Sequence, residues 1–220
     1  MRQKLFFFDA DGTLVPNNAE QGPSQAVCMA LAALRTAGHK TFLCTGRTLC
    51  DIGPGLLSAG FDGVVAGAGA YISLDGACIY HGTIPLPLLR ETVDEIIRQR
   101  ISCLLEGTYG FYYVGQGSRV LRWNFPRIVR AEDLMGDESV EKFTAHVASS
   151  EEFEPLRAFL VPSYEIYGLD NGLFFEMAIK GQDKASAIRR LCAHCGVLPT
   201  DTIAFGDSHN DIAMLRAAGI

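Results

Sequence analysis

The chain has 220 residues, of which 48% are hydrophobic and 20% are charged, and its formal net charge is -6 at pH 7. This composition is typical of a soluble globular protein with one large or two modest domains, and the acidic balance disfavours a nucleic-acid surface. We find no apolar run of about 18 residues for a membrane span and no signal peptide. We therefore expect a cytoplasmic protein, monomeric or homodimeric, without nucleic-acid or membrane partners.

The first 66 residues alternate between predicted strands and helices. Leu5–Phe8 is a continuous apolar run, typical of a strand that is buried on both faces of a parallel sheet. A helix is predicted over residues 27–38, followed by a strand at Thr41–Cys44 and a short, interrupted helix within Thr48–Ser58. Gly63–Ala66 is a third strand. This order predicts an open parallel α/β sheet.

The pattern then changes to a mixture of helices and adjacent strands. Leu74–Ile79 is predicted as a hairpin with Asp75-Gly76 at its turn, and Leu86–Arg100 as an amphipathic helix. The other elements predicted here are strands at Ile101–Leu105, Phe111–Val114, Val120–Trp123, Tyr164–Tyr167 and Phe174–Ile179 and a helix near Ser150–Phe159. This mixture of helices and adjacent strands predicts a separate α+β unit.

The α/β pattern returns at the end of the chain. We predict a helix over Lys184–Cys195, a strand at Thr202–Phe205 and a last helix over about Asn210–Ala218. The chain is therefore predicted to fold as an α/β core domain, residues 1–82 and 181–220, which is interrupted by an inserted α+β domain, residues 83–180.

The seven cysteines are scattered through apolar stretches, which favours buried thiols in a reducing compartment. Cys192 and Cys195 form a CxxC pair inside a helical pattern. The sequence has no second CxxC and no downstream histidine pair, so zinc or redox chemistry there is only an alternative.

Two carboxylates follow the first predicted strand. Asp9 and Asp11 belong to the sequence DADGT, and Asp9 stands where the strand ends. In an open α/β sheet, ligands bind outside the carboxyl ends of the strands. Carboxylates at that place can hold a cation, although Asp-Gly is also ordinary turn chemistry.

A possible phosphate-binding tripeptide follows the second predicted strand. Thr45, Gly46 and Arg47 offer a hydroxyl, a backbone amide and a guanidinium, which together can hold a phosphate. The alternative is a helix cap beside an ordinary surface arginine.

The strand at Thr202–Phe205 ends in the sequence GDSHND. Asp207 would complete an oxygen-rich site with Asp9 that suits a hard ion such as Mg²⁺, and Asp211 could orient a cation or a lysine. Mn²⁺ would fit the same oxygens, and the alternative interpretation is a helix N-terminus.

A lysine begins the helix before this strand. Lys184 opposes the helix dipole there, which makes a purely structural role unfavourable. We expect its charge to stabilise a phosphate in the transition state, and prefer it to Lys180 because it can reach the crevice from the helix N-terminus.

The set DADGT, TGR, KGQDK and GDSHND resembles the haloacid dehalogenase-like superfamily. Within it the chain resembles the Cof-type sugar-phosphate phosphatases, whose α/β cap is inserted between the second and third motifs. The resemblance covers essentially the whole chain. It implies a Mg²⁺-dependent phosphatase that hydrolyses small phosphorylated metabolites through an aspartyl phosphate.

The resemblance also implies a role for each motif residue. Asp9 would be the nucleophile and Asp11 the general acid and base. Mg²⁺ would be held by Asp9, the backbone carbonyl of Asp11 and Asp207. The phosphate-binding and supporting residues would be Thr45, Gly46, Arg47, Lys184, Asn210 and Asp211.

The sequence departs from this family in two places. A position that is often asparagine in the family is Ala68 here, and the chain stops at Ile220, where relatives usually continue with another strand and helix. We therefore expect the core to be truncated or trimmed.

Substrate specificity is expected to lie in residues 83–180, with Tyr109, Phe111, Tyr112, Arg122 and Trp123 as candidates. Two other functions remain open at this stage. A phosphomutase would use the same aspartyl phosphate, whereas a receiver or an inactive binding relative would not turn over. The presence of Asp11, which would supply the proton transfers, argues against a receiver.

Overall fold

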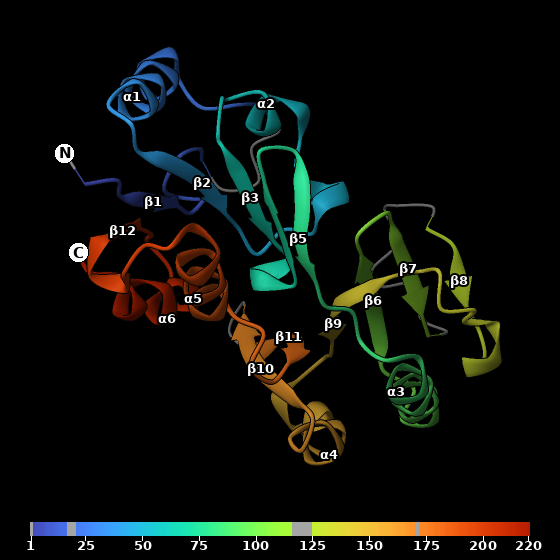
Figure 1. Cartoon of the computed structure of the whole chain (residues 1–220). Helices are drawn as coiled ribbons and strands as arrows, with labels where there is room; N and C mark the ends of the chain where they lie inside the picture. Colours follow the sequence, from blue (N-terminus) through green and yellow to red (C-terminus); the bar gives the residue numbers. More distant parts are fainter. Residues whose placement is uncertain (1, 17–20, 116–124, 170–171) are drawn as a thin grey trace. The chain divides into compact units, whose positions relative to one another are not determined.

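The computed structural model describes residues 2–16, 21–115, 125–169 and 172–220. It divides into two compact units (Figure 1). The first unit comprises residues 1–82 and 181–220, and the inserted unit comprises residues 83–180. Each unit has its own hydrophobic core.

The sheet of the first unit is built around β1. Among the described residues it has six strands in the order β12-β1-β2-β3-β4-β5. Their bounds are Leu5–Phe8 (β1), Lys40–Cys44 (β2), Gly63–Ala66 (β3), Tyr71–Leu74 (β4), Ala77–His81 (β5) and Thr202–Phe205 (β12). The first four in this order are parallel, and β4 and β5 add antiparallel strands at one edge. The predicted parallel α/β sheet is therefore confirmed.

Helices cover both faces of this sheet (Figure 1). Leu5 and Phe7 pack into one core cluster with α5 (Lys184–Cys195) and α6 (Ile212–Ala217). The opposite face meets α1 (Gln25–Thr36) and α2 (Pro54–Leu57), and Leu56 packs there with Leu43 of β2. Because side chains alternate along a strand, β1 supplies apolar residues to both layers.

Local chemistry explains where these elements begin and end. The carboxylate of Asp183 caps the start of α5 by accepting from the backbone N–H of Ser186 at 2.6 Å. Gly196, with φ 66°, caps its C-terminal end. The predicted hairpin is confirmed, with Asp75 and Gly76 both at positive φ in its turn.

Two predicted helices are shorter than expected. The segment Thr48–Ser58 contains a 3₁₀ turn at Leu49–Asp51 and the four-residue α2, because Gly53 and Pro54 interrupt it. The last helix, α6, follows a separate 3₁₀ turn at His209–Asp211.

The inserted unit also contains a six-stranded sheet within its described residues, in the order β10-β11-β9-β6-β7-β8. Its neighbouring strands are antiparallel except for the pair β7–β8. The strand bounds are Ser102–Gly107 (β6), Phe111–Val114 (β7), Arg127–Ile128 (β8), Val140–His146 (β9), Tyr164–Leu169 (β10) and Phe174–Ile179 (β11).

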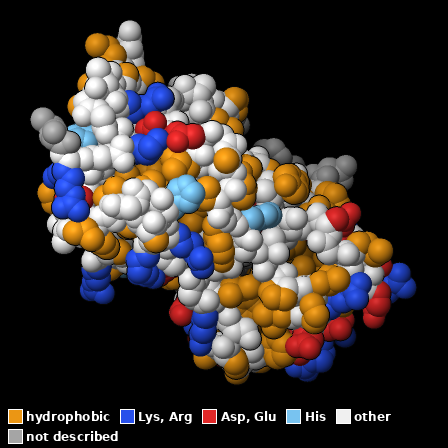
Figure 2. Space-filling view, viewed as in Figure 1, with side chains coloured by type: hydrophobic (Ala, Val, Ile, Leu, Met, Phe, Trp, Pro, Cys, Tyr) orange, Lys and Arg blue, Asp and Glu red, His pale blue; other side chains and the backbone are white. Residues whose placement is uncertain are grey.

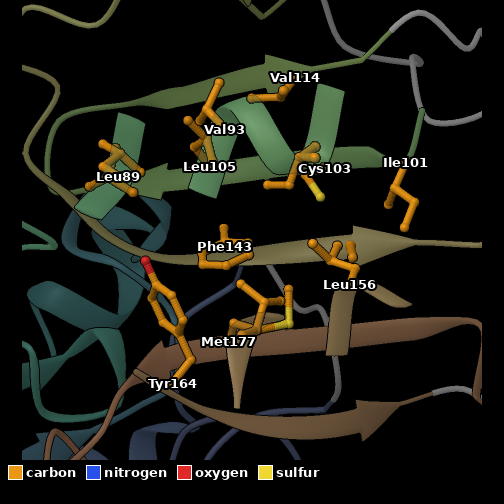
Figure 3. Packing of buried hydrophobic residues seen from close by; sticks show 14 of the residues in the cluster. Leu89, Val93, Ile101, Cys103, Leu105, Val114, Phe143, Leu156, Tyr164 and Met177 are labelled. Carbon is orange, nitrogen blue, oxygen red and sulfur yellow. The ribbon is translucent and has the colours of Figure 1, made fainter. Parts of the chain in front are cut away.

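One face of this sheet packs against α3 (Leu86–Arg98) and α4 (Ser150–Leu160). Phe143 of β9 lies in the resulting core beside Leu105, Tyr164 and Met177 (Figure 3). Strand β9 was not predicted from the sequence, although it pairs with both β6 and β11. The predicted strand Val120–Trp123 lies outside the described residues.

The part of the chain that the structure describes contains no helix with the length and apolarity of a membrane span. Acidic and basic side chains are both distributed over the face seen in Figure 2.

Candidate active site

Asp9 lies at the carboxyl end of β1, between the ends of β2 and β12. Its backbone N–H donates to the carbonyl of Phe205 at 2.9 Å, which fixes the residue beside the end of β12. The side chain is buried, with a residue exposure of only 5%. A carboxylate rarely takes such a place without a cationic partner.

The partner of Asp9 is Lys184, the first residue of α5. Its Nζ lies 2.5 Å from Oδ1 of Asp9 and 2.6 Å from Oδ1 of Asp211. Burial lowers the pKa of Lys184, but neighbouring Cys44 and the carboxylates of Asp9 and Asp211 together raise it above its usual value, so the lysine remains charged. Burial raises the pKa of Asp9, and Lys184 offsets only part of that rise.

Asp211 anchors the loop that follows β12. Its Oδ2 accepts from the backbone N–H groups of Asp207 and Ser208 at 3.2 and 3.1 Å and from the hydroxyl of Ser208 at 2.9 Å. Its Oδ1 accepts from Lys184. Both oxygens are therefore engaged, and this fully buried carboxylate holds the loop and the lysine in place.

Asp207 is exposed and accepts from the hydroxyl of Thr13 at 3.1 Å. The backbone close to it has no room for a side chain, because a Cβ on Gly12 would overlap the carboxylate of Asp207. Gly12 also has a φ of 84°, which glycine adopts at little cost. The glycine of DADGT thus lets Asp207 approach the loop after β1.

Thr45 follows β2 and is buried. Its hydroxyl oxygen accepts from the backbone N–H of Arg47 at 3.1 Å, and its own N–H donates to the carbonyl of Val65. Asn210 reaches the same region, since its amide nitrogen lies 3.7 Å from the Cβ position that Gly46 lacks. The hydroxyl, the glycine and the amide thus gather beside the end of β2.

The guanidinium of Arg47 binds a different carboxylate from the ones that Lys184 binds. Its Nε and Nη2 donate to the two carboxylate oxygens of Asp11 at 2.8 and 2.6 Å. The structure thus pairs Asp9 with Lys184 and Asp11 with Arg47. Lys180, the alternative lysine, is exposed on the inserted unit.

Among the described residues, three carboxylates form a cluster that could hold a metal ion. Asp9, Asp207 and Asp211 each offer one oxygen within 4.8 Å of the others. If all are ionised, three negative charges face the single positive charge of Lys184, which leaves a net charge of −2 for a cation to neutralise. Oxygen donors of this kind fit Mg²⁺.

Only two of the three carboxylates in this cluster are suited to bind the cation. Because Asp211 already binds Lys184 and the loop backbone, Asp9 and Asp207 have the carboxylates that fit a cation. The side chain of Asp11 is engaged by Arg47.

Three features of the site were not identified from the sequence. They are the hydroxyls of Thr13 and Ser208, which bind Asp207 and Asp211, and the left-handed conformation of Ala68, at φ 53°. Thr13 and Ser208 stand inside motifs, so their position offered a signal. The expected asparagine at residue 68 offered another, because asparagine tolerates this conformation better than alanine.

Comparison with known proteins agrees with this architecture. The chain matches the haloacid dehalogenase-like hydrolase family over residues 6–220. It is 25% identical over 221 residues to a protein named phosphoglycolate phosphatase from Methanoculleus marisnigri, covering 99% of this chain and 82% of that relative.

Two solved structures are similar over 99% of the chain. One is a subclass IIB sugar phosphatase of the haloacid dehalogenase superfamily, with 26% identity, a TM-score of 0.79 and 85% of its length covered. The other is a phosphatase of the same superfamily from Bacteroides thetaiotaomicron, with 25% identity, a TM-score of 0.84 and 82% covered.

Proposed function

This chain belongs to the haloacid dehalogenase-like hydrolase family, and we propose that it is a Mg²⁺-dependent phosphatase whose Asp9 becomes transiently phosphorylated. The observation that carries the proposal is the buried Asp9 carboxylate at the end of β1, with Lys184 Nζ at 2.5 Å and Asp207 close by. A nucleophile, a fixed positive charge and a further carboxylate are what phosphoryl transfer to a carboxylate requires.

The reaction proceeds in two displacements at phosphorus. First, an oxygen of Asp9 attacks the phosphorus, the bond to the ester oxygen breaks, and the carboxyl group of Asp11 gives its proton to the departing alkoxide. Second, Asp11 takes a proton from a water molecule whose oxygen attacks the phosphorus. The bond to Asp9 then breaks and inorganic phosphate leaves.

Several groups of the chain bind the phosphoryl group or its metal ion. Asp9, Asp207 and the carbonyl of Asp11 would hold Mg²⁺, which supplies positive charge that offsets the repulsion between two anions. Lys184 supplies a second positive charge next to Asp9. The other phosphate-binding groups are the hydroxyl of Thr45, the backbone N–H of Gly46 and the amide of Asn210.

The names of similar proteins support a proposal for the substrate class. One similar protein is named a phosphoglycolate phosphatase and another a sugar phosphatase. We therefore propose small phosphorylated metabolites as substrates, with sugar phosphates first. Residues 83–180 are assigned as the cap domain that selects among them. Of the aromatic candidates there, Tyr109 is exposed, Phe111 and Tyr112 are half-buried, and Trp123, like Arg122, lies outside the described residues.

The proposal is tested by phosphate release from a panel of sugar phosphates, phosphoglycolate, nucleotides and pyridoxal phosphate, with and without Mg²⁺. We expect metal-dependent release that falls at least about 10³-fold in Asp9→Asn, because the nucleophile is lost. Asp75→Asn makes the same chemical change in the exposed hairpin turn and is the matched control. No release of phosphate from the folded wild-type chain would contradict the proposal.

A further inference from the structure

The guanidinium of Arg47 binds both oxygens of the carboxylate of Asp11. It donates from Nε and Nη2 to both oxygens of Asp11, at 2.8 and 2.6 Å, in the two-point geometry that is specific to arginine. Nη1 lies 3.5 Å from the carbonyl of Asp51. Three nitrogens of this side chain are thus directed at the protein.

The backbone of Arg47 is fixed as well. Its N–H donates to the hydroxyl of Thr45 at 3.1 Å, and its carbonyl accepts from the N–H of Gly67 at 2.7 Å. The side chain of Arg47 is only 14% exposed, and that of Asp11 is 31% exposed. A rigid arginine thus holds a more accessible carboxylate.

Asp11 needs such a partner because of its place in the chain. It follows β1 by three residues and precedes Gly12, which has a φ of 84°. The loop itself provides a turn in which Gly12 N–H donates to the carbonyl of Val15 at 2.8 Å. This turn fixes the backbone of Asp11, but a free carboxylate on it would still sample several rotamers.

From this geometry we propose that Arg47 is a positioning residue for Asp11, and not a ligand of the substrate phosphate as its motif predicts. Arg47 aligns the carboxyl group that serves the leaving group, whereas Lys184, 2.5 Å from Asp9, serves the phosphoryl group. Arg47 and Lys184 therefore have separate roles, the first through Asp11 and the second beside Asp9. This inference rests on the proposed phosphatase function.

The test uses two substrates that differ in their need for a proton. An alkyl phosphate, such as a sugar phosphate from the panel, releases a basic alkoxide, whereas 4-nitrophenyl phosphate releases a weakly basic phenolate. Arg47→Met should reduce kcat for the alkyl substrate about 100-fold. For the aryl substrate, the fold reduction in kcat should be at least tenfold smaller. Inhibition by inorganic phosphate should change less than about threefold.

Two further variants separate alignment from charge. Arg47→Lys keeps the charge but cannot bind both oxygens in parallel, so it should not restore the alkyl activity. In an Asp11→Asn background, Arg47→Met should reduce kcat for the alkyl substrate less than about threefold further, because the residue acts through Asp11. Arg35→Met, which removes the exposed ion pair with Asp62, is the matched control for folding.

Equal losses for both substrates, with weaker inhibition by inorganic phosphate and recovery in Arg47→Lys, would overturn the inference and identify Arg47 as a phosphate ligand. That result would leave the phosphatase function intact. If the wild-type chain releases no phosphate from either substrate, the function itself fails, so the two failures are distinguishable.

Discussion

Each unit of this protein buries one lysine between two carboxylates. In the first unit, Lys184 lies 2.5 Å from Asp9 and 2.6 Å from Asp211. In the inserted unit, Lys142 lies 2.6 Å from Glu176 and 3.1 Å from Glu106. Both lysines are nearly inaccessible to solvent, so the two buried ion clusters can be compared directly.

The two clusters differ in where they stand and in what surrounds them. Lys142, Glu106 and Glu176 belong to three neighbouring strands, and the hydroxyl of Thr144 donates to Glu106 at 2.6 Å. Lys184, Asp9 and Asp211 stand at element ends, and an exposed third carboxylate, Asp207, lies next to them. The cluster around Lys142 is a cross-strand contact that stabilises a sheet, whereas the cluster around Lys184 can receive a ligand.

The largest effect should follow the loss of Lys184. Lys184→Met should lower the turnover of the folded enzyme about 10²- to 10³-fold, because a preorganised positive charge is removed from the phosphoryl group. Steady-state rates measured below the melting transition, normalised to the folded fraction, check this. If Lys142→Met lowers turnover equally, the distinction between the two lysines is wrong.

A loss of stability of about 3 kcal/mol should follow Lys142→Met, because it leaves Glu106 and Glu176 buried without a counterion. Urea denaturation followed by circular dichroism measures it. Burial already raises the pKa of Glu106, and without Lys142 it should rise further. A raised pKa means that the folded state binds protons more tightly than the unfolded chain, so the deficit should shrink as the pH falls.

The matched triple variant Lys142→Met, Glu106→Gln and Glu176→Gln removes all three charges and should recover most of the lost stability. Lys180→Met is the control for an exposed lysine. A deficit in Lys142→Met that is independent of pH would contradict the electrostatic explanation.

The smallest effect concerns the loop beside the site. Ala68 has a φ of 53°, and its backbone N–H donates to the carbonyl of Thr45 at 3.0 Å. Ala68→Gly should raise the free energy of unfolding by about 1 kcal/mol, because glycine adopts this conformation without strain. The same change at Ala70, where φ is −71°, should lower it. Thermal melting of both variants decides whether the site loop of the first unit stores strain.

The sequence allowed the core sheet to be predicted because β1 and β3 are continuous apolar runs and β2 and β12 are mostly apolar. Strand β9 was missed for the opposite reason. Its sequence, VEKFTAH, contains the buried charges Glu141 and Lys142, which interrupt the alternation of apolar and polar residues. Lys142 is compensated by Glu106 on β6 and Glu176 on β11, and Glu141 accepts from the hydroxyl of Thr108, just after β6. All three partners are remote from β9 in the chain.

The site, like the fold, could be predicted only in part from the sequence. The rule that ligands bind at the carboxyl ends of parallel strands indicated that Asp9, Thr45 and Asp207 would be neighbours. It did not indicate which donor binds which oxygen, so the pairing of Arg47 with Asp11 emerged only from the side-chain geometry. Spacing along the chain specifies which loops meet, whereas hydrogen-bond partners depend on rotamers.

Trapping a phosphoryl group on Asp9 is the most direct test of its proposed role as the nucleophile. Asp11→Asn should slow the second displacement, so acid quenching this variant with an aryl phosphate and Mg²⁺ should leave a phosphoryl group on the peptide that contains Asp9, detectable by mass spectrometry. We expect this modification in Asp11→Asn and its absence in Asp9→Asn. Phosphate release by the wild-type chain together with an unmodified Asp9 peptide, or with a phosphoryl group on another residue, would contradict it.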